Sequence, residues 1–283
     1  MPVGDLPDEA IRSSQVSQAS PDPLSSPSHE WGISVDLPTP KVALAVGAHP
    51  DDIEFGCGGT LAKWAASGCS IHHLVLTDGS KGTWDQSTDI EQLRRIRKEE
   101  QSEAARILGG GDVTFLRITD GLLESDMATR KLVCEVIRRV KPDILLGHDP
   151  WRRYRLHPDH RHAGWLVTDG LVVAREPTFF PDAGPAHRPD CLLLWEADSP
   201  NHVEDVTPFF TTKLDALMAH RSQHLSTMGI GTGGVGADEG EKTDDVIASE
   251  SAAFAERVHK QLASHGSLGG VALGEAFHLI DRT

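Results

Sequence analysis

VALAVGAHPDDIEFGCGGT is the sequence of residues 42–60, and it predicts a strand, a polar turn and a helix in that order. The run 42–46 has the length and β-branched content of a buried strand. The HPDD turn at 49–52 follows at its C-terminal end, which is where open α/β sheets bind ligands. The glycine cluster at 56–59 then allows a tight turn before a helical pattern that begins at about Thr60. This order predicts a functional site directly after the first strand.

Strand and helix patterns alternate outward from this stretch. In the first half, strands are predicted at 70–77, 112–118 and 143–147, and helices at 60–67, 90–108 and 127–140. In the less regular second half, helices are predicted at 159–175, 208–224 and 248–263, and a strand at 191–196. Strands that alternate with helices form βαβ units, so we expect an α/β, Rossmann-like fold: a mostly parallel sheet with helices on both faces.

Two segments do not fit this pattern. Residues 1–38 are rich in Ser, Pro, Asp and Gln, and we expect an N-terminal tail that is largely disordered. Residues 226–245 are rich in Gly, Asp and Thr and are expected to form a mobile loop or lid. No internal repeat or boundary interrupts residues 39–283, which are therefore expected to form a single domain.

The composition excludes several classes of partner. The net charge of −15 disfavours nucleic acid and anionic membrane, because both need basic patches. No stretch approaches the ~20 apolar residues of a membrane span, and no basic segment followed by an apolar run indicates a signal peptide. The four cysteines are scattered, which is typical of reduced, buried thiols. We therefore expect a cytoplasmic protein.

Two histidine-acid turns carry the metal-binding chemistry. The first is HPDD at 49–52, and the second is HPDH at 157–160, which precedes a predicted helix. Imidazole and carboxylate are both good ligands of Zn²⁺. Two adjacent carboxylates do not easily reach the same ion, so Asp51 and Asp52 divide into one ligand and one free base. The two turns leave at least one coordination position open, which is the pattern of a catalytic zinc site.

Taken together, these motifs resemble the PIG-L/LmbE-like superfamily of metal-dependent N-acetylglucosaminyl deacetylases. The resemblance covers about residues 41–280 and is carried by AHPDDIEFGCGGT at 48–60 and by HPDH at 157–160. Weaker marks are TDGSKG at 77–82, an Arg/Glu/Ala/Leu/Gly spacing within 97–109, a DG pair at 120–121, HRSQ at 220–223 and EAF at 275–277.

The resemblance implies a role for several residues. It implies His49, Asp52 and His160 as metal ligands, with Zn²⁺ as the default ion and Fe²⁺ as an ion that would fit the same ligands. Asp51 would be the general base, His157 would face the substrate carbonyl, and Asp159 would orient a neighbouring imidazole. Arg97, Asp120 and Tyr154 are candidate substrate contacts. For Arg97 and Asp120, a surface ion pair and a turn are equally good explanations.

One departure concerns the segment before the second turn. Some relatives place a tyrosine two residues before its first histidine, whereas Tyr154 stands three before His157. The same segment carries Arg152, Arg153 and Arg155, which form either a solvated loop or a clamp for an anionic or polyhydroxylated substrate.

The resemblance implies an enzyme that removes an N-acetyl group from an N-acetylglucosamine-type substrate by metal-activated water, giving acetate and a free amine. Two alternatives remain open: a metal-dependent amidase or deacylase of another N-acyl small molecule, and a non-catalytic metal- or sugar-binding module. A dinucleotide-binding protein is excluded, because Leu61 occupies the last glycine position of G-x-G-x-x-G. The expected partner is a small N-acylated amino sugar or related amide, and assembly into a homo-oligomer is left open.

Overall fold

The computed structural model describes residues 32–231 and 244–283. The strands are β1 (Ser34–Val35), β2 (Val42–Gly47), β3 (Ser70–Thr77), β4 (Asp112–Ile118), β5 (Ile144–His148), β6 (Cys191–Trp195), β7 (His202–Asp205) and β8 (Gly274–Asp281). The helices are α1 (Asp52–Ala66), α2 (Ile90–Ile107), α3 (Met127–Val140), α4 (Pro158–Arg175), α5 (Phe210–Met218) and α6 (Asp244–Gly269). None of these helices combines the length and the apolar character needed to cross a membrane.

The strands of the described chain form one sheet in the order β1-β7-β8-β6-β5-β2-β3-β4. All neighbours pair in parallel except β8, which is antiparallel to β6 and to β7. The predicted α/β class, with a mostly parallel sheet, is therefore confirmed. Because β3 and β5 flank β2, the polar segments that follow these strands meet at one edge of the sheet.

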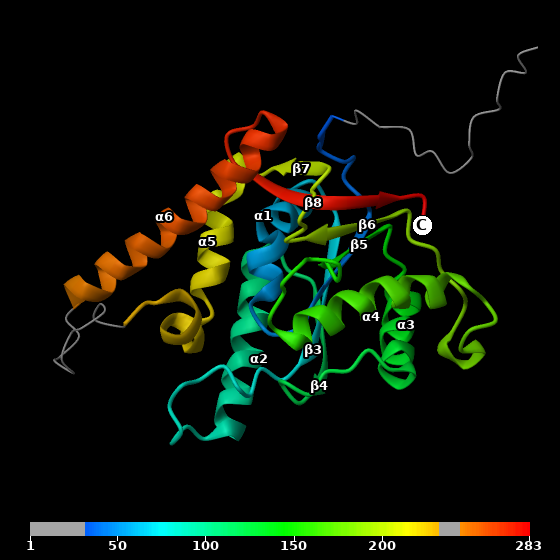
Figure 1. Cartoon of the computed structure of the whole chain (residues 1–283), viewed down its shortest axis with the longest axis horizontal. Coiled ribbons are helices and arrows are strands. Elements are labelled where there is room, and N and C mark those ends of the chain that lie inside the picture. The colour runs from blue at the N-terminus through cyan, green and yellow to red at the C-terminus, as the bar shows by residue number, and fades with distance from the viewer. Residues whose placement is uncertain (1–31, 232–243) are drawn as a thin grey trace, which may run out of the picture. The chain divides into compact units, whose positions relative to one another are not determined.

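Helices cover both faces of the sheet, and Figure 1 shows α3 and α4 on one side and α1, α2 and α5 on the other. Alternation along β2 divides the core, because successive side chains of a strand point to opposite faces. Ala43 and Ala45 pack in the cluster that contains residues of α1, α2 and α5. Leu44 and Val46 pack with α3 and α4. Both faces of β2 are thus buried, which explains its nearly continuous apolar sequence.

Helix α1 begins at Asp52, eight residues earlier than the start predicted at about Thr60. The prediction was wrong because it took the glycine cluster at 56–59 for a turn. A Cβ on Gly59 would lie 2.8 Å from Cβ of Val206, so this glycine serves close packing inside a helix. The helix is kinked at Cys57, where φ is −148° and ψ is 19°.

A buried ion pair satisfies the backbone groups around this kink. Lys213 Nζ donates to the carbonyls of Glu54 and Phe55, at 2.9 and 2.8 Å. The Glu275 carboxylate accepts from the backbone N–H groups of Gly59 and Thr60, at 2.9 and 2.7 Å. Lys213 and Glu275 also contact each other at 2.6 Å. The pair therefore holds the turn of α1 that directly follows the 49–52 segment.

The second half differs most from its prediction. The helix predicted at 208–224 is shorter, because α5 ends at Met218 and is followed by a 3₁₀ turn (Arg221–Gln223) and a π turn (His224–Met228). Strands β7 and β8 of this half were not predicted. At the other end of the chain, β1 was not predicted either, and it lies within the predicted tail 1–38. Residues of α5, α6 and the π turn share a third apolar cluster, which includes the buried Met228 and Ile230. The rest of the predicted tail, 1–31, and residues 232–243 of the predicted lid lie outside the described residues.

Candidate metal centre and active site

A pocket of 430 Å³ lies at the C-terminal ends of β2, β4, β5 and β6. Its acidic, basic and imidazole side chains include His49, Asp51, Asp52, Lys81, Arg97, Asp120, His148, Arg155, His157, His160 and Glu196. Strand ends, their loops and the first turn of α4 thus contribute to one concave site, which is the usual place of an active site in such sheets.

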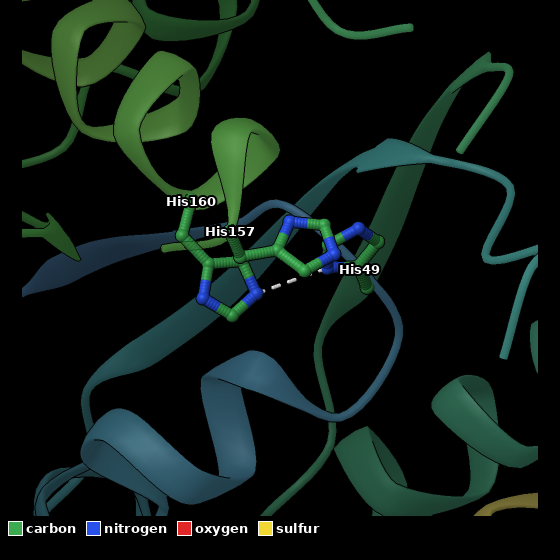
Figure 2. Close-up of side chains that lie close together, drawn as sticks. All are labelled: His49, His157 and His160. Carbon is green, nitrogen blue, oxygen red and sulfur yellow. Dashed lines mark hydrogen bonds between the residues drawn. The ribbon is translucent and has the colours of Figure 1, made fainter. Parts of the chain in front are cut away.

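Three potential ligand side chains converge at the base of this pocket. His49 Nδ1 lies 3.1 Å from His160 Nε2, as the dashed line in Figure 2 marks. Oδ2 of Asp52 lies 3.3 Å from His49 Nδ1, and its Oδ1 lies 3.2 Å from His160 Nε2. In a tetrahedral zinc site with bonds of 2.0–2.1 Å, neighbouring ligand atoms are about 3.3 Å apart. The spacings between these three side chains are therefore compatible with ligands of one metal ion.

The other nitrogen of His49 faces carboxylates. His49 Nε2 lies 3.1 Å from Asp120 and 3.2 Å from Asp159. Burial lowers the pKa of His49, but the hydrogen bonds that its ring donates to Asp120, Asp159 and Asp52 outweigh burial and raise the pKa well above its ordinary value. A metal-ligating histidine commonly donates its second N–H to a carboxylate, which fixes the ring. Asp120 and Asp159 are placed to orient His49 in this way.

Asp51 is held by a different set of partners. Its backbone φ is 99°, a left-handed conformation that is strained for a residue with a Cβ. Its backbone N–H donates to Gln101 at 3.0 Å, and its carboxylate lies 3.4 Å from the Arg97 guanidinium. Burial raises the pKa of Asp51 to about 6, against the opposing effect of Arg97. A carboxylate with this pKa is suited to accept a proton near neutral pH.

The second turn brings its two histidines to the same site. His157 and His160 stack with ring centroids 4.7 Å apart, and the His157 ring lies edge-on to His49 at 4.7 Å. Figure 2 shows the two rings extending from the start of α4 toward His49. Burial and the neighbouring His49 and His160 lower the pKa of His157, so its imidazole is neutral at pH 7. A neutral imidazole at this position can donate one hydrogen bond into the pocket.

Two of the three candidate substrate contacts line the pocket and the third does not. Arg97 and Asp120 line the pocket and are buried. Arg97 is therefore not part of a surface ion pair on its helix. Arg97 donates to the carbonyls of Gly79 and Pro50. Tyr154 is 92% exposed and does not line the pocket, whereas Arg155 does. The register difference noted in the sequence thus places an arginine, and not the tyrosine, beside His160.

Sequence reasoning missed two residues of the site. His148, the last residue of β5, has Nε2 3.3 Å from the Asp52 carboxylate. Glu196, which follows β6, forms an ion pair with Arg155. Burial lowers the pKa of His148, but Asp52 and Glu196 raise it above its ordinary value overall. The only sequence signal for either residue was its position at the C-terminal end of a predicted strand.

Comparisons with known proteins found similar sequences and structures among deacetylases. Residues 44–170 match the family described as PIG-L: GlcNAc-PI de-N-acetylase. The diacetylchitobiose deacetylase of Thermococcus kodakarensis is 37% identical over 187 residues, covering 65% of this chain and 70% of that protein. The 1D-myo-inositol 2-acetamido-2-deoxy-alpha-D-glucopyranoside deacetylase of Rhodococcus jostii is 30% identical over 178 residues, covering 54% of this chain and 58% of the relative. The solved N,N'-diacetylchitobiose deacetylase of Pyrococcus horikoshii is similar with a TM-score of 0.73 and 28% identity, covering 86% of this chain and 84% of that one.

Proposed function

This chain belongs to the PIG-L family of de-N-acetylases, and on that premise we propose that it hydrolyses the acetamide of an N-acetylglucosamine-type sugar. The products are acetate and the free amine. The observation that carries the proposal is the convergence of His49, Asp52 and His160 beside a buried Asp51, at the base of a polar pocket. A binding module has no need of a proton acceptor beside its ligands, so Asp51 favours a hydrolase.

Zinc is the ion we assign to this site. His49 and His160 would supply imidazole nitrogens and Asp52 a carboxylate, a ligand set that zinc prefers and that Fe²⁺ would also accept. When bound, such an ion lowers the pKa of a water toward ~7 and polarises a carbonyl oxygen. Three protein ligands would leave the fourth position of a tetrahedral ion for water or substrate, as in catalytic zinc sites.

Asp51 acts as the general base in this proposal. Its carboxylate removes a proton from the attacking water and later returns that proton to the leaving nitrogen, which leaves as an amine. Arg97 and Gln101 hold the residue from two sides and fix where its carboxylate points. Because burial keeps the pKa of Asp51 at about 6, the group is ionised at pH 7 but remains basic enough to accept a proton.

His157 stabilises the charge that develops on the carbonyl oxygen. Attack on the amide gives a tetrahedral oxyanion, and a donor aimed at that oxygen lowers the barrier. The neutral His157 ring faces the pocket beside His49 and His160. Lys81, Gln223, Thr227 and Gln261 also line the pocket and offer polar groups for sugar hydroxyls.

The test is release of primary amine and acetate from a panel of N-acetylated sugars by the zinc-loaded protein. The panel includes N-acetylglucosamine, N,N'-diacetylchitobiose and an N-acetylglucosaminyl inositol, with N-acyl compounds that lack a sugar beside them. Asp51→Asn is the matched control, and we expect it to bind one metal per chain while losing at least 100-fold in turnover.

Each other outcome rejects a defined part of the proposal. Release only from the non-sugar amides would reject the sugar substrate and favour the deacylase alternative. Metal binding without any release would favour the binding module. Full activity of Asp51→Asn would reject the role of Asp51.

A further inference from the structure

Glu54 is a buried carboxylate to which the proposed reaction gives no task. It lies in the first turn of α1 and is fully buried. We propose that Glu54 is a positioning residue, which holds the side-chain amide of Gln101 in the one orientation that binds the backbone of Asp51. His220 braces Glu54 from its other side. The inference rests on the role of Asp51 as general base in the proposed function.

The peptide group between Pro50 and Asp51 is held at both of its polar atoms. Its carbonyl oxygen accepts from the Arg97 guanidinium at 2.6 Å, and its N–H donates to Oε1 of Gln101 at 3.0 Å. This peptide group precedes the φ torsion of Asp51, which at 99° is strained for a residue with a Cβ. A strained torsion persists only where surrounding contacts fix it. The two hydrogen bonds therefore help to set the direction of the Asp51 carboxylate.

The chemistry of these groups allows one orientation of the Gln101 amide. A backbone N–H can only donate, so the atom that faces Asp51 is the oxygen Oε1. The other atom, Nε2, is a donor that needs an acceptor inside the protein, because Gln101 is fully buried. Nε2 donates to Oε1 of Glu54 at 2.7 Å. Removing this carboxylate would leave a buried donor and would release the amide to turn away from Asp51.

Glu54 is itself fixed by two other parts of the fold. His220, a fully buried residue that follows α5, has Nε2 3.2 Å from the second carboxylate oxygen of Glu54. A carboxylate only accepts, so this ring nitrogen donates. The main-chain carbonyl of Glu54 accepts from Lys213 at 2.9 Å. These contacts leave Oε1 of Glu54 directed at Gln101.

The three buried residues of this network, Glu54, Gln101 and His220, are not among the residues of the described chain that line the pocket. A substrate in the pocket therefore contacts none of them, and they act through Asp51. Loss of such an interaction lowers kcat with little change in KM, whereas loss of a substrate-binding contact raises KM. Zinc binding should be retained, because the network ends at Asp51, which is not a proposed ligand.

The first experiment measures the network in the wild-type protein by NMR hydrogen exchange. The side-chain amide of Gln101 is identified by its absence from Gln101→Met. It is expected to exchange at least about 100-fold more slowly than the side-chain amide of Gln92, an exposed glutamine of the same helix. Equal rates for the two amides would overturn the proposal. The comparison does not depend on the stability of a Glu54 variant.

The second experiment compares the kinetics of two zinc-loaded Glu54 variants. Glu54→Met removes the acceptor and should lower kcat about 10- to 100-fold, with KM within about 2-fold of the wild type and one zinc per chain. Glu54→Gln keeps an oxygen acceptor for Gln101 and should recover most of this loss. Wild-type kcat in Glu54→Met, a raised KM without a fall in kcat, or loss of zinc would each overturn the proposal. So would a Glu54→Gln protein as slow as Glu54→Met.

A double variant tests whether Glu54 acts through Gln101. If it does, Glu54→Met combined with Gln101→Met should be no slower than Gln101→Met alone, because residues that act as a unit are not additive. Losses in kcat that multiply would overturn the proposal. The matched control is Gln92→Met, an exposed substitution on the same helix, which should keep the wild-type kcat.

Hydrogen exchange also separates this inference from the proposed function. In Glu54→Met, the N–H of Asp51 should exchange about 10-fold faster than in the wild type, and this readout needs no turnover. A protein that shows this change but deacetylates no member of the panel would support the positioning role and reject the proposed function. A protein that deacetylates the panel but shows no change at Asp51 would do the reverse.

Discussion

Replacing Lys213 with methionine is expected to lower the free energy of unfolding by about 3–5 kcal/mol. The side chains of Lys213 and Glu275 are only 3% and 2% exposed and lie 2.6 Å apart. Removing one member leaves the other charge buried without its counter-charge, and that loss costs about 3–5 kcal/mol in proteins. For a chain of this size, 1 kcal/mol corresponds to about 2–4 °C, so the melting temperature should fall by roughly 6–20 °C.

The double variant Lys213→Met with Glu275→Leu tests why the pair is there. An ion pair that only matches charges can often be replaced by apolar residues at no net cost. This pair also binds two carbonyls and two N–H groups at the kink of α1. Each buried backbone group left without a partner costs about 1–3 kcal/mol. The double variant should therefore remain at least about 3 kcal/mol less stable than the wild type.

Urea unfolding followed by tryptophan fluorescence gives the midpoints and slopes that this comparison needs. The matched control is Lys260→Met, because Lys260 and Glu256 form an exposed pair on α6, with side chains 74% and 59% exposed. We expect that control to stay within about 1 kcal/mol of the wild type. A Lys213→Met protein equally close to the wild type, or a double variant with the wild-type midpoint, would refute the reasoning.

Three further predictions concern packing, pH and metal. Gly56→Ala should cost about 1–3 kcal/mol, because its Cβ would lie 2.5 Å from the Trp195 ring; an unchanged urea midpoint would contradict this. Burial lowers the pKa of His220, but its hydrogen bond with Glu54 raises it above the ordinary value overall, so its contribution to stability is complete below pH ~6.5 and is lost as pH rises through the folded-state pKa. The difference in melting temperature between wild type and His220→Asn should therefore be larger at pH 6 than at pH 9. A difference that grows with pH would contradict a stabilising interaction between His220 and Glu54. Removal of metal by EDTA should abolish turnover and lower the melting temperature until zinc is restored, because an ion at 100 times its Kd stabilises the fold by about 2.7 kcal/mol. An unchanged melting curve after chelation would argue against the metal site.

Local sequence patterns determined the positions of several strands, helices and turns of this protein. The apolar run of β2 and the helical spacing of α2 and α3 are properties of short segments, so their positions could be predicted without knowledge of their neighbours. The histidine-acid turns at 49–52 and 157–160 could be placed before helices for the same reason. The start of α1 could not be predicted, because the glycines at 56–59 are compatible both with a turn and with close packing inside a helix.

Only the tertiary structure decided what surrounds Asp52. His148 reaches it because β5 pairs with β2, with Gly147 opposite Val46, and no local period in the sequence records which strands become neighbours. The antiparallel pairing of β8 with β6 and β7 likewise depends on hydrogen bonds between distant segments. Tyr154 and Arg155 are adjacent in the chain, yet only Arg155 lines the pocket. The physical reason is common to all three cases: strand order and loop path are set by long-range packing and hydrogen bonding, which act between residues that are far apart in the sequence.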